Sequence, residues 1–314
     1  MTNIVRVKEA LAGFAGEIRF NEPMHRYTSF KIGGEADAMI FPEGVDDLKK
    51  AVLGIKKHRM PFFVMGKGTN LLVLDGGIRG IVINLRYFRK LSLLPDNSLY
   101  AGAGTQLQLI ARHAAGLGLS GLEFASGIPG SLGGAIVMNA GANGEEIGPL
   151  ISGIRILDMD GEIRDIKGNR LRFGYRSSYL PQGIIISAEL GLKRSEKRET
   201  KDKERHEIIR RGKTQPLFLP NAGSVFKNPP GDYAGRIIEE AGLKGLTVGD
   251  AQVSPLHANF IVNMGRATAR DVLALIRMIG KKVETEKGIT LELEIKIIGS
   301  NKRNPHEPEI IKEV

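Results

Sequence analysis

The clearest pattern of apolar and polar residues lies near the end of the chain. Between Leu291 and Ile297, apolar residues at every second position alternate with Glu292, Glu294 and Lys296. Successive side chains of a strand point to opposite faces, so this period of two predicts a strand with one buried and one polar face. The polar face carries two carboxylates and a lysine.

Apolar residues three and four positions apart predict two amphipathic helices, one over residues 45–58 and one that begins at Thr268. Thr268 and Asp271 are placed as in a capping box, with Asp in place of the usual Glu. A highly charged helix is expected over residues 196–211. Shorter helices are expected over residues 7–14, 105–115 (with Thr105 as the N-cap) and 233–241.

Short apolar runs between these helices predict strands, and the sequence is therefore of the α+β class. A hairpin is expected where Asp160–Gly161 separates residues 154–159 from 162–166. The other expected strands cover residues 38–41, 62–65, 72–74, 81–85, 184–192 and 259–263.

Composition narrows the class of protein. With 314 residues and 42% apolar residues, the chain is long enough for two or three globular domains. The absence of Cys excludes disulfides, thiolate metal sites and Cys nucleophiles. The six His residues are scattered, and we expect no metal site. No segment has the pattern of a signal peptide or a membrane span, so a cytoplasmic protein is expected.

The formal charge of +10 favours an anionic partner, either a nucleic acid or a phosphorylated substrate and cofactor. The most basic stretch, residues 193–213, mixes both signs of charge and contains no aromatic residue that could stack on a base. This pattern is typical of a solvated helix and argues against nucleic-acid binding.

Two glycine-rich segments are candidates for binding phosphate. Residues 127–144 contain no charge and mostly small side chains, and residues 66–72 follow a predicted strand. Glycine lets an anionic ligand approach backbone N–H groups, although a tightly packed loop would have the same composition. A third run, Gly116-x-Gly118-x-x-Gly121, follows a helix and not a strand, so we interpret it as a helix C-cap and turn.

Three side chains could take part in chemistry. Ser224 follows Gly223, which leaves its hydroxyl accessible, but no nucleophile elbow surrounds it. Arg176 carries the planar fork that suits a carboxylate or phosphate. Glu294 shares the polar strand face with Glu292. Each also has a structural interpretation, as a turn serine, a surface arginine and a solvated carboxylate.

Taken together, these segments resemble the UDP-N-acetylenolpyruvoylglucosamine reductase family, flavoenzymes of peptidoglycan precursor synthesis. The resemblance implies a vanillyl-alcohol-oxidase-type FAD-binding fold in two subdomains and a separate α+β substrate-binding domain. It places the subdomains at residues 1–66 and 67–203, the latter with a returning strand at 296–304, and the substrate domain at 204–295. The matching motifs are GKGTNLL, GIPGSLGGAIVMNAGA, FGYRSS, PNAGSVFKNP, AGLKG with HANFIVN, and LELEIKIIG.

The resemblance also implies that FAD lies along both glycine-rich segments. Attachment is expected to be non-covalent, because neither segment contains His and the chain has no Cys. The residues expected to contact FAD are Gly66, Lys67, Gly68, Thr69, Asn70, Leu71, Gly127, Ile128, Pro129, Gly130, Ser131, Gly133, Gly134, Ala135, Asn139, Ala140 and Gly141.

The implied reaction is the NADPH-dependent reduction of UDP-N-acetylglucosamine enolpyruvate to UDP-N-acetylmuramate. Hydride reaches the methylene carbon from reduced flavin, and Ser224 matches the proton donor. Arg176 and Glu294 match the residues that hold and polarise the carboxylate, and only the resemblance favours Glu294 over Glu292. The residues expected to contact substrate are Tyr175, Lys227, Asn228, Tyr233 and Lys244.

Arg176 and Ser224 are only 48 residues apart, and the charged helix fills much of that gap, so the chain resembles the shorter type of the family, which lacks a substrate-covering tyrosine loop. We expect a monomer that binds neither membrane nor nucleic acid. Two other functions stay open at this point. One is a different FAD-dependent oxidase or dehydrogenase of the same fold, and the other is a non-catalytic protein that binds anions or RNA.

Overall fold

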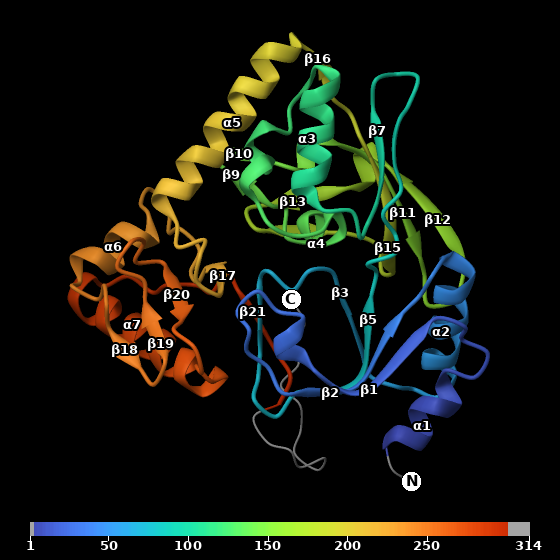
Figure 1. Ribbon diagram of the computed structural model, residues 1–314, viewed down its shortest axis with the longest axis horizontal. Helices are drawn as coiled ribbons and strands as arrows, with labels where there is room; N and C mark the ends of the chain where they lie inside the picture. Colours follow the sequence, from blue (N-terminus) through green and yellow to red (C-terminus); the bar gives the residue numbers. More distant parts are fainter. Residues whose placement is uncertain (1–2, 301–314) are drawn as a thin grey trace. The chain divides into compact units, whose positions relative to one another are not determined.

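The computed structural model describes residues 3–300, which form two compact units, with the elements labelled in Figure 1. Of these residues, unit 1 holds 3–20, Ala38–Lys67 and Gly80–Arg211, and unit 2 holds Asn21–Asp37, Gly68–Arg79 and 212–300. The three-part division at residues 66, 203 and 295 stays a prediction. Residues 301–304 of the expected returning strand lie outside the described part of the chain.

Unit 1 contains a five-stranded sheet in the order β12-β11-β15-β7-β6 and most residues of a four-stranded sheet in the order β1-β2-β5-β3. Its helices are α1 (Asn3–Ala10), α2 (Val45–Lys57), α3 (Leu107–Leu117), α4 (Leu132–Val137) and α5 (Lys197–Thr214, to Arg211). The sheet strands are β1 (Glu17–Pro23), β2 (Glu35–Phe41), β3 (Phe62–Met65), β5 (Ile78–Asn84), β6 (Leu91–Leu93), β7 (Leu99–Gly102), β11 (Ile151–Leu157), β12 (Ile163–Lys167) and β15 (Ile184–Leu190). Three short antiparallel pairs are β9 (Gly141–Ala142) with β10 (Glu145–Glu146), β13 (Arg172–Gly174) with β14 (Ser177–Tyr179), and β16 (Lys193–Arg194) with β8 (Leu119–Ser120).

The core of unit 1 forms where apolar faces of its helices and sheets meet. Leu48, Val52 and Ile55 of α2 are at most 1% exposed, as their helical spacing predicts. β11 pairs with β12 on one side and with β15 on the other, both antiparallel, so it is a central strand. Burying these apolar faces is the main stabilising contribution to the unit.

Unit 2 has its own core, built on the four-stranded sheet β17-β20-β19-β18, and α7 packs against β18 and β19 (Figure 1). Its elements are β4 (Leu71–Val73), β17 (Asn221–Ser224), α6 (Ala234–Glu240), β18 (Thr247–Val248), β19 (Ala251–Val253), β20 (Phe260–Asn263), α7 (Ala269–Lys287) and β21 (Lys296–Ile298). β21 and β4 pair in parallel.

Several predictions from local patterns are confirmed. The capping box of α7 is present, with Asp271 N–H donating to Thr268 Oγ1 and the Asp271 carboxylate accepting from the backbone N–H of Thr268. Gly118 ends α3 in the left-handed conformation, with φ 69°, so the third glycine run is a helix C-cap. The hairpin at Asp160–Gly161 and the charged helix α5 also form.

The long alternating strand over 291–297 is wrong in its extent. Glu294 N–H donates to Val225 O at 2.8 Å, whereas Lys296 N–H donates to Asn70 O at 2.9 Å. The segment therefore changes partner after Ile295, and regular strand pairing covers only Lys296–Ile298. The alternation correctly indicates an extended chain, but it cannot reveal that two different segments share the chain's hydrogen bonds.

Two predicted helix ends also differ. The N-cap of α3 is Gln106 and not Thr105, because Gln106 is held extended by a bridge to Ser131. The first helix ends at Ala10, ahead of Gly13, whose φ of 81° is unsuited to a right-handed helix. Within residues 3–300, no helix is both long enough and apolar enough to cross a membrane.

Two helical glycines offer a matched test of packing in the two units. A Cβ at Gly54 of α2 would overlap the backbone oxygen of Ala10, whereas a Cβ at Gly280 of α7 would meet nothing within 4 Å. Gly54→Ala is expected to lower the free energy of unfolding by about 1–3 kcal/mol through overpacking. Gly280→Ala is expected to raise it by about 0.5–1 kcal/mol through helix propensity. Urea denaturation measures both changes, and equal effects of the two substitutions would contradict the packing at Gly54.

Candidate active site

The Ser224 segment of unit 2 is an irregular strand. β17 pairs with β20, with Asn221 opposite Val262 and Ser224 opposite Phe260, so an irregularity lies between the two pairs. Gly223 supplies the φ of 81° that this geometry requires, and its N–H donates to Asn221 Oδ1 at 2.9 Å. The bulge re-aims the side chain that follows it, and Ser224 is half-buried.

Asn259 fixes the chain immediately after the serine. Its amide group donates to Phe226 O at 2.8 Å, and its side-chain oxygen accepts from Phe226 N–H at 2.9 Å. Its backbone oxygen accepts from Val225 N–H at 2.8 Å. Asn259 is 3% exposed, so these bonds are shielded from water. Sequence reasoning gave Asn259 no role, although it lies in the HANFIVN motif.

The structure brings Glu294 to this same segment. Glu294 N–H donates to the backbone oxygen of Val225, the residue after Ser224, at 2.8 Å. Asn70 Nδ2 donates to Glu294 O at 3.1 Å. Within unit 2, Glu294 thus contacts Asn70 directly and contacts the residue that follows Ser224.

The two glutamates of the alternating segment have different surroundings. The side chain of Glu292 is 74% exposed, and its carboxylate lies 3.2 Å from Lys227 Nζ. Glu294 is half-buried beside the serine segment. An exposed ion pair contributes little to structure and keeps its hydration. Burial therefore distinguishes the two glutamates, which the alternation alone could not do.

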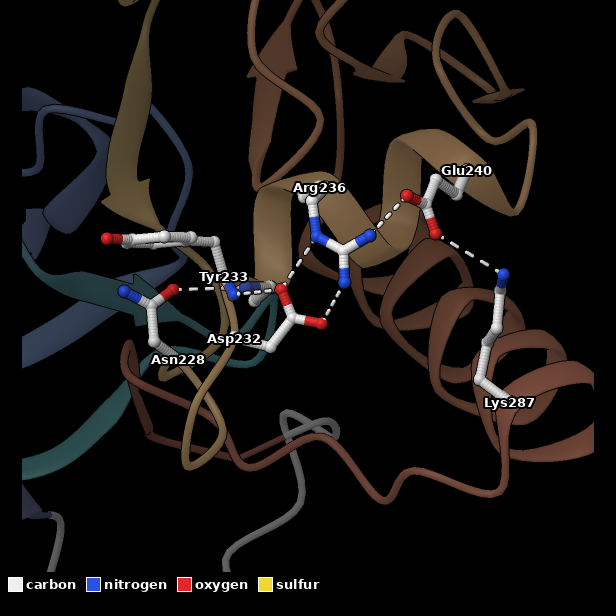
Figure 2. A network of polar contacts seen from close by, with 7 residues as sticks. Asn228, Asp232, Tyr233, Arg236, Glu240 and Lys287 are labelled. Carbon is white, nitrogen blue, oxygen red and sulfur yellow. Dashed lines mark hydrogen bonds and ion pairs between the residues drawn. The ribbon is translucent and has the colours of Figure 1, made fainter.

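A polar network holds the loop that contains Asn228 and Tyr233 (Figure 2). Asn228 Oδ1 accepts from Ala234 N–H at 3.0 Å, and Asp232 Oδ1 accepts from Tyr233 N–H at 2.6 Å. Arg236 pairs with Asp232, and this hydrogen bond lowers the pKa of the Asp232 carboxyl. The Tyr233 ring is 69% exposed, and Figure 2 shows that it points away from Arg236, on the same side as Asn228.

The same network extends along α6 and reaches α7. Arg236 also pairs with Glu240, whose other carboxylate oxygen lies 3.3 Å from Lys287 Nζ (Figure 2). Lys244, another residue expected to contact substrate, lies 2.6 Å from the carboxylate of Glu239. These hydrogen bonds and ion pairs hold α6 and the loops that carry Tyr233 and Lys244 in place.

Arg176 belongs to unit 1, where it occupies the turn of a hairpin. β13 pairs with β14 so that Gly174 lies opposite Ser177, which leaves Tyr175 and Arg176 as the turn residues. Arg176 has a φ of 54°, an uncommon conformation for a residue with a side chain. Its guanidinium donates to Gly141 O at 3.0 Å, lies 3.9 Å from the Glu146 carboxylate and 4.9 Å from the Tyr175 ring centroid. A strained, anchored arginine is typical of a functional position.

The two glycine-rich segments meet within unit 1. A Cβ on Gly66 would overlap the side chain of Ser131, so the Ser131 side chain packs directly against the Gly66 backbone. Gly130 has a φ of 141°, which a residue with a Cβ rarely adopts. Asn139, fully buried, donates to Gly174 O at 2.9 Å and to Glu146 Oε2 at 2.6 Å, and accepts from Gly148 N–H.

These segments suit a flavin dinucleotide. Small residues leave peptide groups open to a phosphate, and charged side chains are rare within these segments. The side chain of Asn139 is already engaged by the protein, so a contact from this residue would come from its backbone. The individual FAD contacts expected from the sequence stay predictions.

Comparison with known proteins first defines the class. Residues 36–167 match the model of the FAD binding domain family, which together with the α+β fold defines an FAD-binding protein of the vanillyl-alcohol-oxidase type. Residues 215–298 match the family described as UDP-N-acetylenolpyruvoylglucosamine reductase, C-terminal domain. The first match covers Gly127–Gly141, and the second covers Ser224 and Glu294.

Similar proteins of known name cover nearly the whole chain. The UDP-N-acetylenolpyruvoylglucosamine reductase of Caldanaerobacter subterraneus subsp. tengcongensis is 45% identical over 94% of this chain and 97% of its own length. That of Geotalea uraniireducens is 44% identical over 95% and 99%. The crystal structure of the Thermus caldophilus enzyme matches with a TM-score of 0.77 and 38% identity, covering 90% of this chain and 98% of that one.

The chain therefore belongs to the UDP-N-acetylenolpyruvoylglucosamine reductase family. The resemblance inferred from the six motifs is confirmed, as are the fold class and the FAD-binding domain.

Proposed function

We propose that the protein catalyses the NADPH-dependent reduction of UDP-N-acetylglucosamine enolpyruvate to UDP-N-acetylmuramate, a step of peptidoglycan precursor synthesis. Family membership supports the reaction. The contact between Glu294 and the residue after Ser224 supports a common site for these two residues. A cytoplasmic, monomeric enzyme is part of the same proposal. Bound FAD supplies the transfer of hydride from NADPH to the substrate.

Ser224 is proposed as the proton donor. Addition of hydride to the methylene carbon leaves negative charge on the neighbouring carbon, and this charge spreads into the carboxylate. Such a carbanionic enolate is a strong base, so a hydroxyl of ordinary acidity can protonate it. The bulge at Gly223 and the bonds from Asn259 hold the serine segment in one conformation, which limits the reorganisation needed for proton transfer.

Arg176 is proposed to bind the substrate carboxylate, where the negative charge develops, and Glu294 to donate a hydrogen bond to it from a protonated carboxyl group, because an ionised glutamate would repel that charge. The guanidinium fork matches a carboxylate in two parallel hydrogen bonds. Preorganised groups of this kind stabilise the transition state more than the ground state, because the charge they contact grows during the reaction. Tyr175, Lys227, Asn228, Tyr233 and Lys244 are proposed to contact the rest of the UDP-sugar.

Anaerobic half-reactions test the proposal. The purified protein is expected to bind FAD, to lose its flavin absorbance on addition of NADPH, and to regain it on addition of UDP-N-acetylglucosamine enolpyruvate. Recovery with oxygen but not with this substrate would indicate a different flavin oxidase or dehydrogenase. A protein that takes up no FAD would contradict both flavin-dependent functions.

A further inference from the structure

The helix α5 carries an arginine that the proposed reaction does not use. Arg211 lies near the end of α5, directly after Arg210. The family models match residues 36–167 and 215–298, so Arg211 lies between them and neither match covers it. Within unit 1, its side chain reaches the start of the longer glycine-rich segment.

The stem of Arg211 occupies the space that a side chain at Gly127 would fill. A Cβ built on Gly127 would overlap Arg211 Cδ and lie 3.0 Å from Nε. Gly127 does not have a positive φ, so its backbone would accept another residue. The glycine is needed at this position for close approach of the arginine and not for a special backbone conformation.

Arg211 forms no direct ion pair within the described residues, although Glu207 attracts its charge at longer range. Its buried Nε has no hydrogen-bond partner there. Arg210, by contrast, donates to Glu207 Oε2 at 3.0 Å, and Glu207 also accepts from Asn143 at 2.8 Å. Burial, reinforced by the neighbouring charge of Arg210, lowers the pKa of Arg211 to about 10. A desolvated cation without a direct ion-pair partner is unfavourable, so an anion bound there would be stabilised.

We propose that Arg211 is a phosphate-binding residue, whose guanidinium pairs with a phosphate group of a nucleotide bound along Gly127. The guanidinium fork matches phosphate oxygens in geometry and charge. The inference rests on the proposed function in one respect, since FAD, NADPH and the UDP-sugar all carry such a group. Gly127 lies within the stretch matched by the FAD-binding model, so FAD is the ligand expected to depend on Arg211.

Three titrations on Arg211→Leu test this role. FAD is added to the deflavinated protein and followed by flavin fluorescence. NADP⁺ and UDP are added separately to the FAD-loaded protein and followed by flavin absorbance and calorimetry. Loss of one charge-assisted contact is expected to weaken FAD binding about tenfold or more. A loss of affinity for NADP⁺ alone, or for UDP alone, would mean that Arg211 binds a phosphate group of that ligand. Affinities within about twofold of wild type for all three would overturn the proposal.

Matched variants separate binding from folding. Arg198→Leu is the control, because Arg198 lies on the same helix with its side chain 95% exposed, and it should leave all three affinities unchanged. Removing an unpaired buried charge should not lower the melting temperature of the deflavinated protein. A lower melting temperature with unchanged FAD affinity would show that Arg211 is structural and would overturn the proposal.

A double-mutant cycle tests the contact with Gly127. Gly127→Ala is expected to weaken binding of the same ligand, because its Cβ displaces the stem of Arg211. This loss of affinity should be smaller when Gly127→Ala is combined with Arg211→Ala than when it is made alone. Additive losses would contradict the contact. Failure of the enolpyruvyl substrate to re-oxidise the wild-type protein would overturn the proposed reaction but not this inference. Normal turnover by the wild-type protein, together with unchanged ligand affinities in Arg211→Leu, would overturn this inference but not the proposed reaction.

Discussion

Ser224→Ala is expected to leave reduction of the flavin by NADPH near the wild-type rate and to slow re-oxidation by UDP-N-acetylglucosamine enolpyruvate by about 10²–10⁴-fold. The first half-reaction requires no proton from the protein to a substrate carbon. The second half-reaction does require such a proton, and Ser224 carries the hydroxyl that directly follows the bulge at Gly223. Anaerobic stopped-flow absorbance of the flavin measures the two rates separately.

Ser152→Ala is the matched control, because the Ser152 hydroxyl is exposed and donates to Glu189 O at 3.2 Å in unit 1. Both half-reactions of this variant should proceed at wild-type rates. If Ser224→Ala slowed both half-reactions equally and also lowered the melting temperature, Ser224 would be a structural residue of the bulge and the assignment as proton donor would be wrong.

Glu294→Ala should slow re-oxidation by about 10²–10³-fold, the loss typical of removing one group that stabilises developing negative charge. Glu292→Ala should change the same rate at saturating substrate by no more than about threefold, because its contact with Lys227 is an exposed ion pair. The comparison is informative because the two residues are identical and only two positions apart.

The pair also tests the local geometry. Glu294 is held by its N–H to Val225 and by Asn70, and the backbone parts of both contacts persist when the side chain is removed. The melting temperature of Glu294→Ala measures separately how much the side chain contributes to the stability of the fold. Equal kinetic losses in the two variants would mean that the whole segment, and not the Glu294 carboxyl, matters.

Local signals in the sequence were sufficient where the structure depends on neighbouring residues. The capping box at Thr268 and Asp271 and the C-cap at Gly118 involve only residues a few positions apart. The extent of the last strand and the N-cap of α3 depend on distant partners, Asn70 and Ser131, and both predictions failed. An element boundary that is fixed by a residue distant in the sequence cannot be predicted from the residues next to it.

In the candidate active site, the sequence identified the candidate residues but not the contacts that hold them in place. Ser224, Arg176 and Glu294 were each a weak candidate by residue type, and the family motifs selected them. Their support could not be predicted, because Asn259 reaches the serine segment from the turn before β20, and Gly141, which accepts from Arg176, belongs to a different hairpin. Glu292 and Glu294 differ in burial, which alternation along an extended chain does not determine.

The pairing of β4 with β21 has a consequence for the order of synthesis. Leu71–Val73 is made early, yet its partner Lys296–Ile298 is near the end of the chain. At typical elongation rates, about 11–45 s separate the two strands as they are translated. During this interval the apolar β4 lacks its native neighbour, and unit 2 cannot close its fold. The half of the molecule that carries Ser224 and Glu294 can therefore complete its fold only after residues 296–298 have been made.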